Sequence, residues 1–235
     1  MNIVITAGGT SENIDAVRKI TNTSTGRLGS IIFGQLVKNR PANEKIQVFY
    51  IAPRNAVKIP LDDIDIESDD VYIKEYTTTD TLSVLEAITN VLKTNKIDYF
   101  IHSMAISDYR VEKVMNSNLD KLDNSKKLSS DEESLLVRLV KTPKIINKIK
   151  ELSPSTTLFG FKLLNNVQES DLIEAAKKQF VNAGSDYILA NDSANITATQ
   201  HKAMLIRKND LEKLYLNTKE EIGNAIASII YNKSF

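Results

Sequence analysis

Cysteine is absent from this 235-residue sequence, and histidine occurs only twice, as His102 and His201. The absence of cysteine excludes disulfide bonds, thiolate metal sites and a cysteine nucleophile. Two histidines that lie so far apart in the sequence also argue against a histidine-rich metal cluster. These absences exclude several common kinds of catalytic and metal site at once.

An excess of charge of either sign is also lacking, because 30 Lys and Arg residues balance 30 Asp and Glu residues. This balance excludes the chain-wide basic field that drives binding to nucleic acids or anionic membranes. No apolar stretch reaches the roughly 18 residues that a membrane span needs, and the sequence begins directly with a strand-like run. We therefore expect a single cytoplasmic domain over residues 1–235, without nucleic-acid or membrane partners.

Apolar, strand-like runs alternate with amphipathic segments along the chain. Strands are predicted at residues 2–6, 46–52, 71–76, 98–103, 134–140, 157–163 and 186–190. Helices are predicted at residues 28–38, 79–93, from Pro143 onward, 167–182 and 218–231, with a C-terminal hairpin at 204–207 and 213–216 before the last of them. This alternation predicts a three-layer, Rossmann-like α/β fold with a mainly parallel central sheet.

Two stretches fall outside the alternation. A long loop is expected between the first strand and the first helix. Residues 111–133 are polar, carry charges of both signs and contain neither glycine nor proline. We interpret this second stretch as a mobile surface flap that a ligand would order.

Ligands of such a sheet bind beyond the carboxyl ends of its strands, so the loops there carry the candidate sites. Gly8 and Gly9 follow the first strand and allow the backbone to approach a phosphate or a base, although a tight turn would also use them. Residues 20–29 gather hydroxyl and amide side chains before a helix, which is typical either of an anion site or of a helix cap.

Two later loops also follow predicted strands. Small residues from Ser103 leave room for a flat ring, and Asp108 is either a ligand or metal contact or an ordinary solvent-facing acid. Lys141 is a candidate phosphate clamp. His102 lies within an apolar run, which favours a hydrogen-bonded core histidine over a catalytic base; His201 receives no role.

Several blocks of this sequence together resemble the phosphopantothenoylcysteine synthetase family. In order they are ITAGGTSENIDAVRKITNTSTGRLG, AISDYR, VKTP, GFKLL and ILANDSA, and they extend from Ile5 to Ala194. The resemblance implies a ligase of coenzyme A biosynthesis that joins 4'-phosphopantothenate to L-cysteine through an acyl-nucleotidylate. In the bacterial members this is an acyl-cytidylate made from CTP, with release of pyrophosphate and then CMP; Mg²⁺ is implied, and flavin is not.

The resemblance also carries expectations about partners. The chain begins at the synthetase and so resembles the stand-alone bacterial form, which implies a separate decarboxylase in the pathway. A homodimer is implied, with the late strands as an exchange element.

Roles are assigned by the resemblance residue by residue. Asn22 acts on the acyl intermediate and, with Ser24 and Gly26, binds the substrate. The flap lysine is Lys127 in the run KLSS, and Lys121 is a second fit. The implied nucleotide-binding residues are Gly8, Gly9, Ser103, Met104, Ala105, Asp108, Val140, Lys141, Thr142, Pro143, Phe161 and Lys178, with Asp108 also the metal contact.

Some features keep alternatives open. Met104 and Lys162 stand where the fused bacterial enzymes commonly have alanine, so the choice between CTP and ATP is not settled. A Rossmann-type NAD(P)-dependent reductase and a non-catalytic nucleotide-binding module are the alternatives. The reductase lacks support, because the chain has no G-x-G-x-x-G and its second strand ends in Pro53 and Arg54 without an acid.

Overall fold

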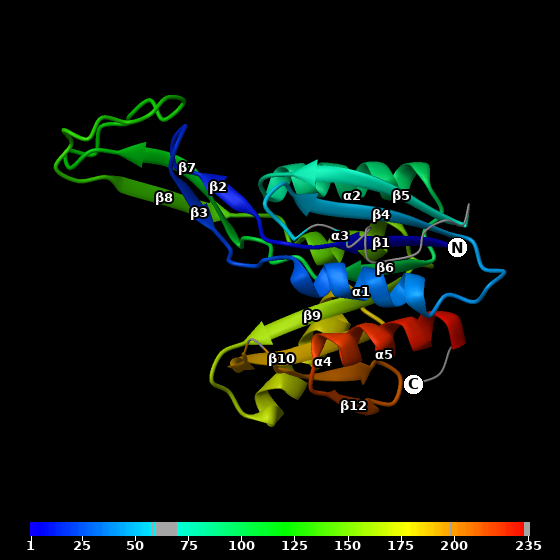
Figure 1. Ribbon diagram of the computed structural model, residues 1–235. Helices are drawn as coiled ribbons and strands as arrows, with labels where there is room; N and C mark the ends of the chain where they lie inside the picture. Colours follow the sequence, from blue (N-terminus) through cyan, green and yellow to red (C-terminus); the bar gives the residue numbers. More distant parts are fainter. Residues whose placement is uncertain (58, 60–69, 198, 233–235) are drawn as a thin grey trace.

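A computed structural model describes residues 1–57, 59, 70–197 and 199–232, and it confirms the three-layer α/β fold (Figure 1). The central sheet has the order β12-β11-β10-β9-β6-β1-β4-β5. The strands from β10 to β5 run parallel, whereas β11 and β12 pair antiparallel at one edge. The strands of this sheet are β1 (Asn2–Thr6), β4 (Ile46–Pro53), β5 (Val71–Thr78), β6 (Tyr99–His102), β9 (Thr157–Leu164), β10 (Tyr187–Ile196), β11 (His201–Arg207) and β12 (Lys213–Leu216).

Helices cover both faces of the sheet. On one face α1 (Arg27–Lys38) packs with α5 (Lys219–Asn232), and on the other lie α2 (Thr81–Thr94), α3 (Ile145–Leu152) and α4 (Glu169–Ala183). Strand β1 shows why its sequence is continuously apolar: Ile3 and Ile5 pack in the α1 and α5 layer, and Val4 packs in the opposite layer. No helix within the described ranges is long and apolar enough to cross a membrane.

Two small ladders form an arm that projects from the body of the molecule (Figure 1). They are β2 (Ser11–Asn13) with β3 (Lys19–Thr21), and β7 (Tyr109–Met115) with β8 (Leu136–Lys141). The sequence-based prediction of a loop at the first pair, and of flap residues at 111–115, was wrong. The predicted strand at 134–140 is confirmed as β8. Strands β2, β3 and β7 pair outside the central sheet and stay partly exposed, so they lack the apolar runs that mark the central strands.

The flap between β7 and β8 lies at the far end of the arm and contacts the β2–β3 hairpin. Asn124 Nδ2 donates a hydrogen bond to the Ile14 carbonyl at 2.9 Å, and the Leu128 backbone N–H donates to Asp15 Oδ2 at 3.2 Å. The Leu128 side chain is buried. The flap is therefore anchored by contacts that its polar composition did not indicate.

The predicted start of one helix also needs correction. Pro143 does not open a helix, because α3 begins at Ile145 and the Thr142 backbone N–H and hydroxyl are already bonded to the Asp108 and Ser107 carbonyls, at 3.0 and 2.6 Å. The predicted C-terminal hairpin is confirmed, because β11 and β12 pair antiparallel and extend the central sheet.

His102 is a core histidine, as expected. Its Nδ1 lies 2.9 Å from Thr6 Oγ1, and burial lowers its pKa to about 4. The ring is therefore neutral near pH 7.

Candidate active site

The loops that follow β1 and β6 form one layer at the carboxyl edge of the sheet. Thr10 N–H donates to the Ala105 carbonyl at 3.1 Å, and Ala105 N–H donates to the Gly8 carbonyl at 2.9 Å. At Gly9 a Cβ atom would lie only 1.9 Å from the Asn22 carbonyl oxygen, so this close approach requires glycine. The predicted glycine pair thus brings the segment around Asn22 against the loop after β6.

Asn22 links two parts of the site. Its Nδ2 donates a hydrogen bond to the Ile106 carbonyl at 2.9 Å, which ties it to the loop after β6. Gly26, in the left-handed conformation with φ 78°, is the N-cap of α1, and a Cβ there would lie 3.1 Å from the Gly8 nitrogen. The first turn of α1 has no acidic residue and begins with Arg27, so this helix end favours an anion.

A pocket lies between the loop after β6, strand β9, and helices α3 and α4; we call it the central pocket. It is open to solvent and, with the space at its mouth included, spans about 560 Å³. Apolar side chains form part of its wall, and Asp108, Lys144 and Lys162 bring charge to it. Its lining residues are His102, Met104, Ile106, Asp108, Pro143, Lys144, Ile145, Ile146, Phe161, Lys162 and Gln179.

Four predicted nucleotide-binding residues line the central pocket, namely Met104, Asp108, Pro143 and Phe161. Other members of the predicted set lie nearby or support it. Ser103 Oγ donates to the Thr6 carbonyl at 2.7 Å, while Val140 and Lys141 pair with Arg110 and Tyr109 at the base of the arm.

Lys178 does not line the central pocket. It is exposed on α4 and pairs with Glu174 at 2.5 Å, whereas the next residue, Gln179, lines the pocket. Sequence reasoning missed Gln179 because it searched this helix for a cation, and an uncharged amide gave no signal. The helical phase shown by Ala176, Phe180 and Ala183, which are buried, could have placed position 179 next to the sheet.

The flap that carries both predicted lysines belongs to the arm, which projects from the body of the molecule (Figure 1), and neither lysine is in the lining of the central pocket. Lys127 and Lys121 are both exposed, on the flap that the arm carries. The structure therefore does not bring either lysine together with the residues of the central pocket within one chain.

Asp108 is the only carboxylate in the lining of the central pocket, and its Oδ1 lies 2.5 Å from Lys144 Nζ. Over the described ranges, no group of three or more His, Asp or Glu side chains could hold a metal ion. One paired carboxylate does not make a protein-held cation site; it fits the single contact that Mg²⁺ makes when phosphates supply its other ligands.

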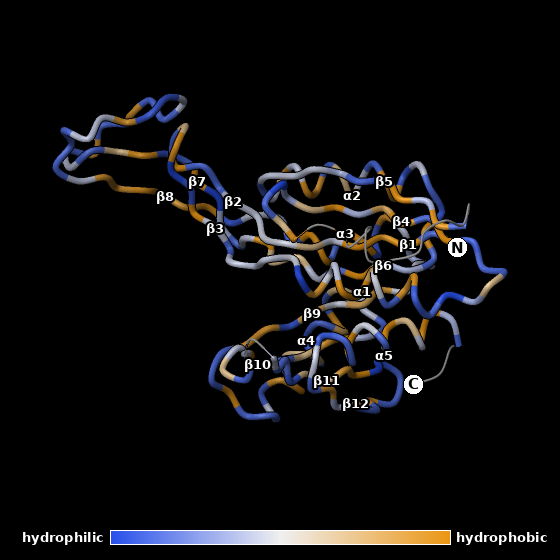
Figure 2. Tube along the Cα trace, viewed as in Figure 1, coloured by the Kyte–Doolittle hydropathy of each residue, from blue (hydrophilic) through white to orange (hydrophobic). Residues whose placement is uncertain are grey.

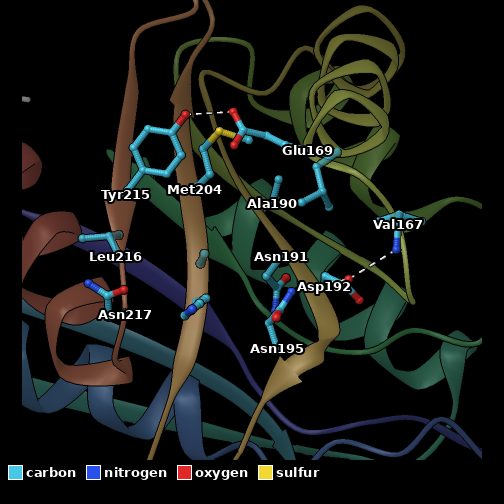
Figure 3. Close-up of a pocket in the computed structure, with 13 residues that line it drawn as sticks. Val167, Glu169, Ala190, Asn191, Asp192, Asn195, Met204, Tyr215, Leu216 and Asn217 are labelled. Carbon is cyan, nitrogen blue, oxygen red and sulfur yellow. Dashed lines mark hydrogen bonds between the residues drawn. The ribbon is translucent and has the colours of Figure 1, made fainter.

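A second pocket lies where α4 meets β10, β11 and β12; we call it the edge pocket (Figure 3). Its main polar groups are bonded within the chain. Asp192 accepts hydrogen bonds from the backbone N–H groups of Ala194, Asn166 and Val167, at 3.0, 2.8 and 3.3 Å, and these bonds lower its pKa. Tyr215 donates its hydroxyl to Glu169 Oε1 at 2.8 Å. Asp192 thus holds the loop before α4 in place.

Known proteins match almost the whole chain. A family model described as DNA/pantothenate metabolism flavoprotein C-terminal domain matches residues 1–233. The coenzyme A biosynthesis bifunctional protein CoaBC of Thermococcus kodakarensis is 32% identical over 225 residues, 95% of this chain and 49% of the relative. CoaBC of Methanocaldococcus jannaschii is 29% identical over 227 residues, with the same coverage. The chain spans about half the length of these curated relatives.

Solved structures agree with this assignment. The DNA/pantothenate metabolism flavoprotein from Streptococcus pneumoniae is 34% identical, with a TM-score of 0.81 and full coverage of both chains. A Cab2 mutant in complex with phosphopantothenate-cysteine shares the fold, with 16% identity, a TM-score of 0.71, and coverage of 99% of this chain and 86% of that one. As the order of its sequence blocks indicated, this chain belongs to the DNA/pantothenate metabolism flavoprotein C-terminal domain family.

Proposed function

We propose that this chain is a phosphopantothenate–cysteine ligase that works through an acyl-nucleotidylate. The carboxylate of 4'-phosphopantothenate attacks the α-phosphate of a nucleoside triphosphate and displaces pyrophosphate. The cysteine amine then attacks the acyl carbon, so that an amide forms and the nucleoside monophosphate leaves. Support comes from relatives named for coenzyme A biosynthesis and from the complex of Cab2 with phosphopantothenate-cysteine.

The observation that carries this proposal is the position of Asn22 between two subsites. One side is the central pocket, which Ile106 lines; the other is the N-terminus of α1, which favours the negative charges of the acid substrate. One N–H of the Asn22 amide bonds Ile106. The other can donate to the acyl oxygen as charge develops there during cysteine attack.

In the central pocket, apolar and charged lining residues would contact different parts of the nucleotide. Met104, Ile106 and Ile146 offer apolar surface for a base, and Lys144 and Lys162 offer positive charge for phosphates. We propose CTP as the nucleotide, on the sequence resemblance. Mg²⁺ would be held mainly by the phosphates with Asp108 as one protein contact, and would neutralise charge on the triphosphate when bound.

We also propose a homodimer in which the arm reaches a second copy. The arm leaves Tyr109, Leu136 and Leu139 exposed by 48%, 41% and 41%, and apolar residues follow both of its long strands (Figure 2). Burying these side chains against a second copy would remove apolar surface from water. Lys127, which is exposed on the flap that the arm carries, would then serve the partner's site.

Pyrophosphate release tests the function. With 4'-phosphopantothenate, CTP and Mg²⁺ but no cysteine, a single turnover should release pyrophosphate and leave an acyl-cytidylate detectable by mass spectrometry. A requirement for cysteine would contradict the two-step route. Binding of CTP without release would favour a non-catalytic module, and oxidation of NAD(P)H would favour a reductase.

A further inference from the structure

Gln179 presents an unsatisfied hydrogen-bond donor at the central pocket. Its Nε2 atom is buried and has no hydrogen-bond partner, although the residue lines the pocket. A buried amide N–H without a partner costs about 1–3 kcal/mol. Such a group in a pocket is a place where a bound molecule supplies the missing acceptor.

Strand β9 is shaped to admit this amide. At Gly160 a Cβ atom would lie 2.2 Å from Gln179 Nε2, 3.0 Å from Ser185 Oγ and 3.2 Å from Ile146 Cδ1. Any side chain at position 160 would therefore displace the carboxamide. Ser185 Oγ is also buried and unpartnered, but Ser185 does not line the pocket, so it provides an internal control.

The surroundings of Gln179 indicate what it contacts. Ile146 of α3 lies close to the same point of Gly160 that Gln179 approaches, and Met104 and Ile106 add further apolar lining. The cations of this pocket are Lys144 and Lys162. A neutral amide among apolar side chains cannot balance the charge of a triphosphate, whereas it matches a heterocycle that pairs a ring-nitrogen acceptor with an amino donor.

We propose that Gln179 determines nucleotide specificity by reading the base of the bound nucleotide. Its Nε2 donates to the acceptor edge of cytosine, and its Oε1 accepts from the exocyclic amino group. This proposal rests on the proposed function for the identity of the nucleotide. It assigns the discrimination between bases to an amide instead of to Met104 or Lys162.

Gln179→Met removes both hydrogen-bonding groups and keeps the length of the side chain. We expect kcat/KM for CTP to fall about tenfold or more, mainly through KM, while UTP changes much less, so that the CTP:UTP ratio collapses. Calorimetric titration with CMP should show the same loss without any turnover. Gln179→Glu, which keeps the shape but offers no donor when ionised, should also weaken CMP binding.

Ser185→Ala is the matched control and should leave the CTP:UTP ratio unchanged. Gly160→Ala should reproduce the loss through displacement of the amide and should add little to Gln179→Met in the double variant. Equal losses for CTP and UTP, matched by Ser185→Ala, would make the amide a structural partner of Ser185 and overturn the proposal. Weaker CTP binding with unchanged CMP binding would place the amide at the phosphates and also overturn it.

The two proposals fail separately. If the wild-type protein binds CMP but releases no pyrophosphate under any condition, the ligase function is wrong. A comparison of CMP binding by the wild type and Gln179→Met still tests whether Gln179 recognises the base. If pyrophosphate is released normally by both proteins with an unchanged CTP:UTP ratio, the ligase function stands and the role of Gln179 is wrong.

Discussion

Helix α4 contributes to both pockets, with Gln179 in the lining of the central pocket and Glu169 in the lining of the edge pocket. In the edge pocket, Asp192 and the Glu169–Tyr215 pair are satisfied within the chain. In the central pocket, a buried amide donor is left without a partner. Polar groups satisfied inside a fold stabilise it, whereas an open donor in a pocket indicates a ligand. The contrast separates a structural site from a binding site more sharply than pocket size does.

The largest effect should come from Asn22→Asp, at the side of the central pocket. The carboxylate cannot donate to the Ile106 carbonyl or to an acyl oxygen, so cysteine coupling should slow by about 10²–10³-fold. Pyrophosphate release should continue, and the acyl-nucleotidylate should accumulate in quenched reactions analysed by mass spectrometry.

Asn195→Asp makes the same change in the edge pocket and is the control. It should cost some stability, because Asn195 Nδ2 lies 3.5 Å from Asp192 Oδ2, but should leave both half-reactions as they are. If Asn22→Asp slowed both half-reactions equally and no intermediate appeared, Asn22 would be only a loop residue.

Substitutions of the flap lysines test whether the flap, which adds no lysine to the central pocket of its own chain, takes part in the reaction. Lys127→Gln should raise the barrier for acyl-nucleotidylate formation by ~3 kcal/mol, because a cation beside the developing phosphorane is lost. Pyrophosphate release should then be about 100-fold slower. Lys121→Gln should be nearly silent in the same pyrophosphate assay. The reverse ranking would move the role to Lys121, and two silent variants would remove the flap from the mechanism.

Mixing two inactive variants tests the dimer. When Lys127→Gln and Asn22→Asp proteins are unfolded together and refolded, mixed dimers should contain one site with both residues intact. Complete coupling should therefore return to a fraction of wild-type activity. No recovery in mixtures shown by native mass spectrometry to contain mixed dimers would contradict action of the flap on a second copy.

In the edge pocket, Asp192→Asn should affect stability and leave the chemistry of the folded enzyme intact. Backbone hydrogen bonds lower the pKa of Asp192, so its stabilisation is present above the unfolded-state pKa near 3.9 and is lost as pH falls through the folded-state pKa. The variant should melt several degrees lower at pH 7. Its melting temperature should also fall less than that of the wild type as the pH is lowered. An identical acid dependence in thermal melts of both proteins would show that Asp192 does not contribute this way.

The smallest effect should come from Tyr215→Phe. It removes the exposed hydrogen bond to Glu169 and should lower stability only slightly in denaturant titrations. CTP kinetics should not change. A marked change in KM for CTP would show that the edge pocket communicates with nucleotide binding, and the contrast between the two pockets would fail.

The elements and residues that the sequence predicted correctly are those whose apolar pattern follows from burial. Strand β1 is apolar along its length because both faces are covered, and His102 within an apolar run proved to be a bonded core histidine. Of the arm's strands, β8 was predicted at residues 134–140. The other three were missed because they pair in partial contact with solvent, where no apolar run is required. The helix of Lys178 was located correctly, but only the three-dimensional contact with Gly160 shows that Gln179 is the residue turned to the pocket.

The most direct test of the contrast between the pockets follows the side-chain amides by NMR as CMP is added. The Gln179 side-chain resonance, assigned by its absence in Gln179→Met, should shift and saturate with the binding isotherm, because the base supplies the partner that its buried N–H lacks. The side-chain amides of Asn195 and Asn217, in the edge pocket, should stay in place. Saturable shifts at Asn195 and Asn217 with none at Gln179 would contradict the account.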